Sequence, residues 1–286
     1  MQLTGKTRVL GIIGHPVAHS LSPLMQNAAI VALGLDYIYV PFPVEPQDLP
    51  GAVKGLRSLG VHGFNVTLPY KTAIIPLLDR ISPEAELSGA VNTVKREDGL
   101  LIGYNTDGTG FIKSLAVDLC FNPLGATVLI LGAGGAARGA TAALCSSGVR
   151  KIIVANRTME NALALVTSFS DKYRGIEFGL SSLETKELAG PLGAANLLVN
   201  TTSVGMSGSS FNNLDLEVMT TGAKVYDMVY SPPETPLIAA AKRRNLSCAN
   251  GLGMLAAQGE NAFYLWTGVT PPPGTMKTML LKAINL

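Results

Sequence analysis

The sequence predicts an α/β protein of two domains, each built around a largely parallel β-sheet. Short apolar runs rich in Val, Ile and Leu alternate with helical stretches along the chain, which is the pattern of successive βα units. Near the middle of the chain, one apolar run leads directly into a glycine-rich turn and a helix at 127–147, as in parallel sheets that bind ligands. The length of 286 residues fits two domains better than one sheet of that many strands.

The first third of the chain is expected to contain three strands, two helices and a hairpin. The strands are predicted at Val9–Ile13, Tyr37–Phe42 and His62–Val66, and the helices lie between them at about 23–33 and 47–58. Ser22 is expected to cap the first helix, because serine followed by proline at the first helical position is a typical helix start. The hairpin pairs Ala90–Lys95 with Leu100–Tyr104 around a turn at Glu97-Asp98-Gly99.

A second α/β series begins near Gly108. Its strands are predicted at Thr127–Leu131, Lys151–Ala155, Ile176–Gly179, Asn196–Asn200 and Lys224–Val229. From about Gly251 the chain is expected to be helical again, with an interruption at Pro271-Pro272-Pro273.

Composition excludes several classes of protein. With 47% hydrophobic and 15% charged residues the chain is not predicted to be disordered, and no run reaches the roughly 18 apolar residues of a membrane span. No signal-peptide pattern is visible, so we expect a cytoplasmic protein. The net charge of +2 is spread over mixed signs, which argues against nucleic-acid binding. The histidines and cysteines lack metal-ligand spacing, so no metal site is expected.

The turn after Leu131 has the composition of a dinucleotide site. Gly132, Gly134 and Ala137 fit the pattern G-x-G-x-x-[G/A], in which the residues allow a tight turn, close approach of a pyrophosphate and helix–strand packing. The N-terminus of the following helix would offer free N–H groups to the phosphates. A purely structural βα turn is the alternative, but the preceding strand, the following helix ending at Gly148 and the next strand favour the nucleotide.

The end of the next strand favours NADP over NAD. NAD sites usually place Asp or Glu there to bind the ribose 2′-hydroxyl, whereas this chain has Asn156-Arg157-Thr158. A guanidinium group can pair with the 2′-phosphate of NADP, and a hydroxyl can donate to it. The alternative is a solvent-exposed arginine at a helix start.

Several polar residues in the first third are candidates for a substrate site. Ser20 and Ser22 lie beside a predicted helix N-terminus and could bind a carboxylate. Lys71 and Asp107 follow predicted strands, and Asn92 lies in the first strand of the predicted hairpin. Taken singly, each has an ordinary interpretation as a cap, a loop residue, a solvated charge or a turn residue.

Taken together, these segments resemble the shikimate dehydrogenase family. The resemblance rests on S-L-S-P (20–23), N-V-T-L-P-Y-K (65–71), G-A-V-N-T (89–93), N-T-D-G (105–108), G-A-G-G-A (132–136), N-R-T (156–158), Y-D-M-V-Y (226–230) and N-G-L-G-M-L-A-A-Q (250–258). The eight motifs occur in family order with typical spacing over nearly the whole chain. The residues alone would support only an NADP-linked oxidoreductase.

The resemblance implies a fold and an activity. A Rossmann-type NADP-binding domain, residues 108–250, would be inserted into an α/β substrate-binding and catalytic domain made of 1–107 and 251–286. The enzyme would catalyse the reversible NADPH-dependent reduction of 3-dehydroshikimate to shikimate, in aromatic amino acid (chorismate) biosynthesis. Its partners would be this small-molecule substrate and no nucleic acid or membrane, with a monomer or homodimer as the expected assembly.

The resemblance also assigns roles to residues. Lys71 and Asp107 would be the catalytic pair at the reacting hydroxyl. Substrate binding would involve Ser20, Ser22, Thr67, Asn92, Tyr230 and Gln258. Cofactor binding would involve Gly132, Ala133, Gly134, Gly135, Ala136, Asn156, Arg157, Thr158, Met228 and Gly251. Oxidising an alcohol requires a base for the hydroxyl proton, and the conjugate acid serves the reverse reaction; whether Lys71 or Asp107 transfers the proton stays open.

Two departures from the family pattern leave alternatives open. Members with strong NADP preference often carry a second arginine where this chain has Asn161, beside Glu160, so the preference for NADP is expected to be weaker. The segment Leu265-Trp266-Thr267-Gly268 is similar to that of quinate/shikimate dehydrogenases, which makes dual specificity the second hypothesis. A non-catalytic NADP-binding sensor would not need Lys71 and Asp107, and a folate-linked dehydrogenase would not need the serine pair and the 65–71 motif.

Overall fold

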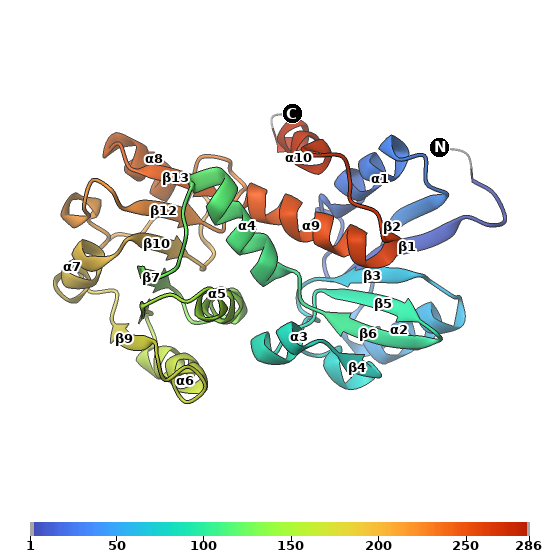
Figure 1. Cartoon of the computed structure of the whole chain (residues 1–286), viewed down its shortest axis with the longest axis horizontal. Helices are drawn as coiled ribbons and strands as arrows, with labels where there is room; N and C mark the ends of the chain where they lie inside the picture. Colours follow the sequence, from blue (N-terminus) through green and yellow to red (C-terminus); the bar gives the residue numbers. More distant parts are fainter. Residues whose placement is uncertain (1–2, 285–286) are drawn as a thin grey trace. The chain divides into compact units, whose positions relative to one another are not determined.

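The computed structural model describes residues 3–284, which form two compact units. Unit 1 comprises residues up to Gly110 together with the segment from Leu255 onward, and unit 2 comprises Phe111–Met254. The boundaries fall inside two helices, α4 (Asp107–Leu119) and α9 (Leu252–Thr267). Each unit contains one six-stranded sheet (Figure 1).

The sheet of unit 1 is mixed, with the strand order β2-β1-β3-β5-β6-β4. Its strands are β1 (Arg8–Gly14), β2 (Tyr37–Pro43), β3 (Gly63–Val66), β4 (Arg80–Ile81), β5 (Thr93–Glu97) and β6 (Leu100–Tyr104). The first three strands are parallel, whereas β5 runs antiparallel to both β3 and β6. The β5–β6 hairpin turns at Asp98 and Gly99, which both have positive φ, the requirement of a tight two-residue hairpin loop.

The helices of unit 1 connect and cover this sheet. They are α1 (Ser22–Ala32), the 3₁₀ turns at Pro46–Asp48 and Ile75–Leu77, α2 (Leu49–Ser58), α3 (Pro83–Ser88), the C-terminal part of α9, and α10 (Thr275–Ile284). One cluster of buried side chains joins β3 to α2, with Phe64, Val53 and Leu56 among its members. Indole Nε1–H of Trp266 in α9 donates to Val94 O at 2.9 Å, so the end of the chain is tied to the hairpin.

The sheet of unit 2 is parallel throughout, in the order β13-β12-β10-β7-β8-β9. Its strands are β7 (Thr127–Leu131), β8 (Lys151–Ala155), β9 (Glu177–Ser181), β10 (Leu197–Asn200), β12 (Lys224–Asp227) and β13 (Ser247–Asn250), and the short β11 (Val204–Ser207) is not among them. Read from β9, this is the order 3-2-1-4-5-6 of the Rossmann fold. The direction of winding reverses between β7 and β10, which is where such folds bind dinucleotides.

Helices follow nearly every strand of unit 2. They are α5 (Gly135–Ser146), α6 (Met159–Ser170), α7 (Thr185–Ala194), a 3₁₀ turn at Leu216–Val218, and α8 (Pro236–Arg243), while the part of α4 from Phe111 precedes β7. Alternate side chains of the strands, such as Leu129, Ile153 and Leu198, pack against α7 and α8 in one buried cluster. The opposite set, such as Val128 and Ile130, is equally buried, as expected for a parallel sheet covered on both faces.

Most of the predicted elements are present. The strands at 100–104, 127–131 and 151–155 have the predicted bounds, and the others differ by a few residues. The short strands β4, β11 and β13 and the helices α3, α4, α6, α7 and α8 lie in segments for which no bounds had been predicted. The mixed α/β fold with a Rossmann-type unit is thereby confirmed.

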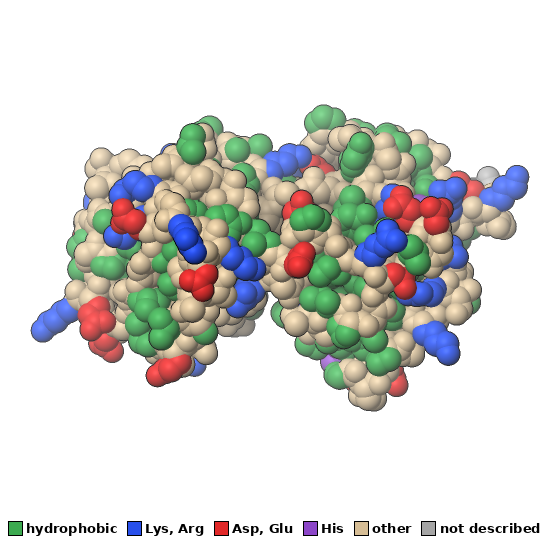
Figure 2. Space-filling model, turned by 60° about the horizontal axis from the view of Figure 1, so that its bottom comes forward, with side chains coloured by type: hydrophobic (Ala, Val, Ile, Leu, Met, Phe, Trp, Pro, Cys, Tyr) green, Lys and Arg blue, Asp and Glu red, His purple; other side chains and the backbone are tan. Residues whose placement is uncertain are grey.

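The surface carries charges of both signs. On the face drawn in Figure 2, Lys and Arg side chains are interspersed with Asp and Glu side chains. No helix within residues 3–284 is both long enough and apolar enough to cross a membrane.

Candidate active site

Lys71 and Asp107 form an ion pair in unit 1. Lys71 lies in the turn that follows β3, and Asp107 is the first residue of α4. Lys71 Nζ donates to Asp107 Oδ2 at 2.6 Å, and the two side chains are 31% and 21% exposed. The predicted catalytic pair is therefore brought together from segments 36 residues apart, in a position that a small molecule can reach.

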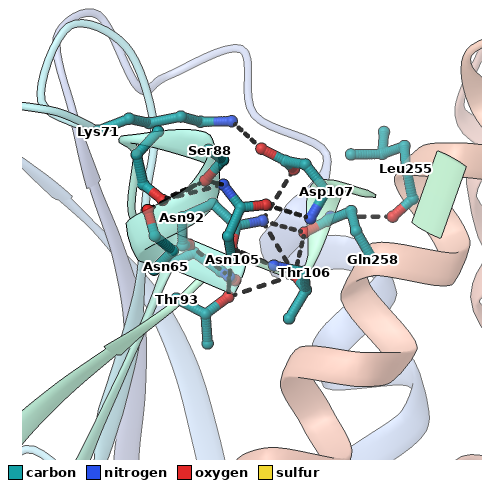
Figure 3. Close-up of polar contacts among 12 residues, drawn as sticks. Asn65, Lys71, Ser88, Asn92, Thr93, Asn105, Thr106, Asp107, Leu255 and Gln258 are labelled. Carbon is teal, nitrogen blue, oxygen red and sulfur yellow. Dashed lines mark hydrogen bonds and ion pairs between the residues drawn. The ribbon is translucent and has the colours of Figure 1, made fainter. Parts of the chain in front are cut away.

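Asn92 holds the other side of the carboxylate (Figure 3). Its Nδ2 donates to Asp107 Oδ1 at 2.8 Å, and its Oδ1 accepts from the backbone N–H of Thr106 at 2.8 Å. Because a backbone N–H can only donate, this second bond fixes which end of the amide faces Asp107. The backbone N–H of Asp107 donates in turn to Asn105 Oδ1 at 3.0 Å, so the aspartate is held at both ends.

Gln258 joins this group from α9. Its Oε1 lies 3.4 Å from Asn92 Nδ2, and its Nε2 donates to Leu255 O at 2.9 Å. This approach of α9 depends on Gly110, which has no side chain: a Cβ atom there would lie only 2.8 Å from the Gln258 backbone nitrogen. The amide is thus oriented by its own helix toward Asn92, across a separation of 166 residues.

A buried layer beneath these residues had not been assigned from the sequence. The Tyr39 hydroxyl donates to Asn65 Oδ1 at 2.7 Å, and Asn65 Nδ2 donates to Asn92 O and to Thr93 Oγ1, both at 3.0 Å. Burial holds the pKa of Tyr39 well above its ordinary value, so the phenol keeps the proton that it donates. A signal was available: Asn65 is a polar residue inside a fully buried strand, and buried polar groups need partners.

The predicted helix cap at Ser22 is wrong. The capping position is Leu21, whose backbone is already helical, so Ser22 is the first residue inside α1 and its side chain caps nothing. Instead Ser20 Oγ accepts from the Ser22 backbone N–H at 3.2 Å. Ser22 is 5% exposed and lowers the pKa of Tyr39 by hydrogen bonding, so this serine faces the interior beside the polar layer.

Thr67 follows β3 directly and is half-buried. Gly14, at the end of β1, lies against the Thr67 side chain. Any side chain at residue 14 would clash with Thr67, because its Cβ atom would lie 2.3 Å from Thr67 Cγ2. The predicted substrate residues Ser20, Ser22, Thr67, Asn92 and Gln258 all belong to unit 1, whereas Tyr230 belongs to unit 2. Burial raises the pKa of Tyr230 above its ordinary value.

The glycine-rich turn in unit 2 has the geometry that a pyrophosphate needs. Gly132 has a φ of 107°, and a Cβ there would lie 2.8 Å from Thr201 Oγ1. Gly134 precedes α5 in an extended conformation, and Gly134, Gly135 and Ala136 are exposed while Ala133 is half-buried. Ala137 is completely buried, so it packs the helix on the strand. The first N–H groups of α5 therefore face an open turn, which favours an anion.

The end of β8 provides a cation. Asn156 Nδ2 donates to Thr158 O at 2.8 Å and shapes the turn around Arg157. Arg157 lines a pocket of about 450 Å³ together with residues that include Ser182, Glu184 and Phe211. Within residues 3–284 it forms no ion pair, so its guanidinium group is available for a phosphate.

Met228 and Gly251 meet at the ends of β12 and β13. The Met228 N–H donates to Asn200 O at 3.0 Å, and a Cβ at residue 251 would lie 2.2 Å from Met228 O. Only glycine allows this backbone approach.

Among the described residues no group of three or more His, Cys, Asp or Glu side chains could hold a metal ion.

These features define a class of protein. A Rossmann-type sheet, with a glycine-rich turn that could receive a phosphate and an arginine at the end of the next strand, accompanies a lysine–carboxylate pair suited to moving a hydroxyl proton. The class is that of the NADP-linked oxidoreductases that act on alcohols.

Comparisons with known proteins identify the family. Residues 12–94 match the family model of the shikimate dehydrogenase substrate binding domain, residues 115–203 that of shikimate/quinate 5-dehydrogenase, and residues 251–281 that of the shikimate 5′-dehydrogenase C-terminal domain. A shikimate dehydrogenase (NADP(+)) of Geobacter metallireducens is 59% identical over 285 residues, which is 100% of both chains. The chain belongs to the shikimate dehydrogenase family.

Two solved structures agree with this assignment. Shikimate 5-dehydrogenase from Listeria monocytogenes, in complex with shikimate and NAD, has a TM-score of 0.92 at 36% identity and covers 98% of each chain. Shikimate 5-dehydrogenase from Thermus thermophilus, in complex with NADP(H) and shikimate, has a TM-score of 0.85 at 40% identity and covers 96% of this chain and 99% of that chain.

Proposed function

We propose that this protein is an NADP-dependent shikimate dehydrogenase, which interconverts shikimate and 3-dehydroshikimate. The observation that carries the proposal is the Lys71–Asp107 pair, held by Asn92 and completed by Gln258. A protein that only sensed NADP would need no such pair. The family membership and the high identity to proteins of this name support the same conclusion.

The pair acts on the hydroxyl that is oxidised. As hydride leaves the ring carbon, the hydroxyl proton moves to Lys71 or Asp107, and the same proton returns when the ketone is reduced. Asp107 keeps Lys71 in place through its Oδ2, while Asn92 keeps Asp107 in place through its Oδ1. The nicotinamide of bound NADP supplies or accepts the hydride.

The other polar residues of unit 1 bind and orient the ring. Asn92 and Gln258 have amide groups beside the pair, and with Thr67 they would hydrogen-bond the ring hydroxyls. Ser20 and Ser22 would donate to the substrate carboxylate, with Tyr230 as a further ligand. Ser20 precedes α1, so the positive end of the helix dipole adds to its attraction for an anion.

The cofactor residues divide into two groups. Gly132, Ala133, Gly134, Gly135 and Ala136 would bind the pyrophosphate, and Asn156, Arg157 and Thr158 would bind the 2′-phosphate. Met228 and Gly251, at the ends of β12 and β13, would lie along the nicotinamide half. On this assignment residues 108–250 are the NADP-binding domain and residues 1–107 with 251–286 the catalytic domain. A cytoplasmic location and a monomer or homodimer remain predictions.

The test is an initial-rate assay of the purified protein with shikimate and quinate, each with NADP and NAD. We expect the highest kcat/KM with shikimate and NADP, and consumption of NADPH with 3-dehydroshikimate. Comparable kcat/KM for quinate would establish dual specificity instead. Loss of activity in EDTA with recovery in zinc would contradict the proton transfer assigned to Lys71 and Asp107.

A further inference from the structure

A buried carboxylate lies at the end of β12, in unit 2, outside the sites described above. Asp227 and its neighbour Asn200, at the end of β10, are fully buried and face each other in the register of the two strands. Asn200 Nδ2 donates to Asp227 Oδ1 at 2.8 Å, and Thr235 Oγ1 donates to Asp227 Oδ2 at 2.6 Å. The backbone N–H of Val229 donates to Oδ1 at 3.0 Å.

The hydrogen-bond pattern indicates that this group is ionised. Asn200 Nδ2 and the Val229 N–H can only donate, and Thr235 Oγ1 already accepts from the Ile238 N–H at 3.2 Å, so its own proton is free for Asp227. Burial raises the pKa of Asp227 above its ordinary value, while these three bonds lower it. Within residues 3–284 its partners are neutral donors, so the negative charge is uncompensated by any cation in contact.

Asp227 and Asn200 organise the loops around them. Asn200 Oδ1 accepts from Thr202 N and Thr202 Oγ1, and the 201–202 turn lies against Gly132, where it would meet a Cβ at 2.8 Å. Asp227 also holds the backbone of Val229 through the Val229 N–H. The preceding residue is Met228, and its carbonyl oxygen lies so close to Gly251 that no side chain fits at residue 251. The pair therefore sets the relative positions of three loops at the carboxyl edge of the sheet.

The topology indicates which part of a dinucleotide lies at this edge. A Rossmann sheet consists of two mononucleotide-binding halves that meet at the point of reversed winding, here between β7 and β10. Arg157 at the end of β8 marks the half that would receive the adenosine. The nicotinamide then belongs to β10, β12 and β13, whose last residues are Asn200, Asp227 and Asn250. Asp227 is the charged residue among these three.

We propose that Asp227 is a charge-selecting and positioning residue of the nucleotide site, which favours the oxidised, cationic nicotinamide over the reduced, neutral ring. The inference rests on the proposed function, because it requires that NADP binds this edge. A buried charge acts through a lower effective dielectric than a surface charge, so its effect on a nearby cation survives without direct contact. The oxidised and reduced cofactors share all other charged groups, so their difference in affinity isolates this effect.

The experiment measures dissociation constants rather than activity. NADP⁺ and NADPH are titrated onto wild type, Asp227→Asn and Thr235→Ser by calorimetry. Asp227→Asn keeps the shape, and its Nδ2 can donate to Thr235 Oγ1. We expect Asp227→Asn to raise Kd for NADP⁺ by about 5- to 20-fold and Kd for NADPH by less than about twofold. Thr235→Ser keeps the hydroxyl that donates to the same carboxylate and removes one methyl group but no charge, so it should change both constants by the same factor.

The outcomes are distinct. Equal weakening of NADP⁺ and NADPH in Asp227→Asn would show that Asp227 only supports the loops, and unchanged constants for both would remove it from the site; either result overturns the inference and leaves the proposed function standing. Failure of the wild type to bind either cofactor overturns the proposed function as well. If Asp227→Asn does not give a cooperative unfolding transition, the same ratio is measured on Asp227→Ser, which is smaller and also uncharged.

Discussion

The candidate substrate site in unit 1 and the nucleotide edge in unit 2 are built in opposite ways. In unit 1, Lys71, Asp107, Asn92 and Gln258 are side chains from four segments, held mainly by bonds to one another. In unit 2, the turn at Gly132 and Gly134 and the approach of Gly251 to Met228 depend on the absence of side chains. Substitutions that remove side-chain groups should therefore impair the site in unit 1, whereas substitutions that add a side chain at these glycines should impair the nucleotide edge in unit 2.

The chemistry of the two ligands explains the difference. Ring hydroxyls and a reacting proton require individual donors and acceptors at fixed positions, which side chains provide. A pyrophosphate requires several N–H groups and room for its oxygens, which a bare backbone at a helix N-terminus provides. Arg157 is the exception in unit 2, because a 2′-phosphate is recognised by a charged side chain.

The largest effect is expected when the catalytic pair is broken. Lys71→Ala and Asp107→Ala should each lower kcat with shikimate by about 10²- to 10⁴-fold, because they remove a proton-transfer group or its partner. Both side chains are partly exposed, so the unfolding temperature should change little. Lys95→Ala, which breaks an exposed ion pair with Glu97 on β5, is the matched control and should keep wild-type kcat. Near wild-type kcat in Lys71→Ala would refute its role.

The next largest effect is expected at Arg157, the side chain in unit 2 that we assign to the 2′-phosphate. Arg157→Ala should raise KM for NADP by about 10- to 150-fold, the loss of a charge-assisted hydrogen bond worth roughly 1.5–3 kcal/mol. KM for NAD should stay nearly constant, since NAD carries no 2′-phosphate. Cofactor titrations at saturating shikimate measure both. Equal weakening of NAD and NADP would mean that Arg157 supports the loop or the adenine instead.

Adding atoms to the turn should weaken cofactor binding while leaving the fold intact. A Cβ at residue 134 meets no atom within 4 Å, so Gly134→Ala should fold. It should raise Kd for NADP by at least about tenfold, or about 1.4 kcal/mol, because the methyl group enters the space of the pyrophosphate. Gly139→Ala, inside the following helix α5, also meets no atom and should raise the unfolding free energy by about 0.5–1 kcal/mol with unchanged binding. Unchanged Kd in Gly134→Ala would place the pyrophosphate elsewhere.

Removing the hydroxyl groups of Ser20 and Ser22 should have a smaller effect than breaking the catalytic pair. Ser20→Ala and Ser22→Ala should each raise KM for shikimate by about tenfold with little change in kcat, because the carboxylate keeps its charge throughout the reaction. Since Ser20 Oγ accepts from the Ser22 N–H, Ser20→Ala should also lower the unfolding free energy by about 0.5–1 kcal/mol. Ser22→Ala should not remove a helix cap. Wild-type KM in both variants would show that the carboxylate binds elsewhere.

The smallest effect concerns the departure from the family pattern at residue 161. Asn161→Arg should lower KM for NADP by about two- to threefold, because a second cation joins Arg157 but exposed ion pairs contribute only about 0.2–1 kcal/mol. Glu160 lies next to this position and would offset part of the gain. Asn161→Gln is the uncharged control. A gain of the same size in Asn161→Gln would exclude charge as the cause.

Much of this architecture followed from local sequence patterns. The strands at 127–131 and 151–155 had correct bounds, because buried parallel strands are continuous apolar runs between glycine or polar turns. The phosphate-binding turn was visible for the same reason, since its glycines have a defined spacing after a strand. Lys71 and Asp107 became a pair only through the resemblance to a family.

The features that were missed depend on distant contacts. Hydrogen bonds join Tyr39 to Asn65 across 26 residues and Asn200 to Asp227 across 27 residues. The periodicity of the sequence does not predict such bonds. The cap at Ser22 failed for a different reason: the local signal of serine before proline was present, but the helical turn begins at Leu21. Local patterns therefore predicted strands and turns, while the polar networks that orient the sites required coordinates.

The division of unit 1 into two chain segments has a consequence for biosynthesis. Gln26 Nε2 donates to Gly259 O across 233 residues, and Gln258 and Trp266 contact Asn92 and Val94. A chain emerging from the ribosome can complete the sheet of unit 2 as soon as β13 is made, but these contacts form only after α9 follows. The N-terminal segment must therefore wait through the synthesis of about 140 intervening residues. During that interval Asn92 and Val94 would lack their partners in α9. The nascent chain would also expose the apolar surface that α9 later covers, which is the kind of surface that chaperones bind.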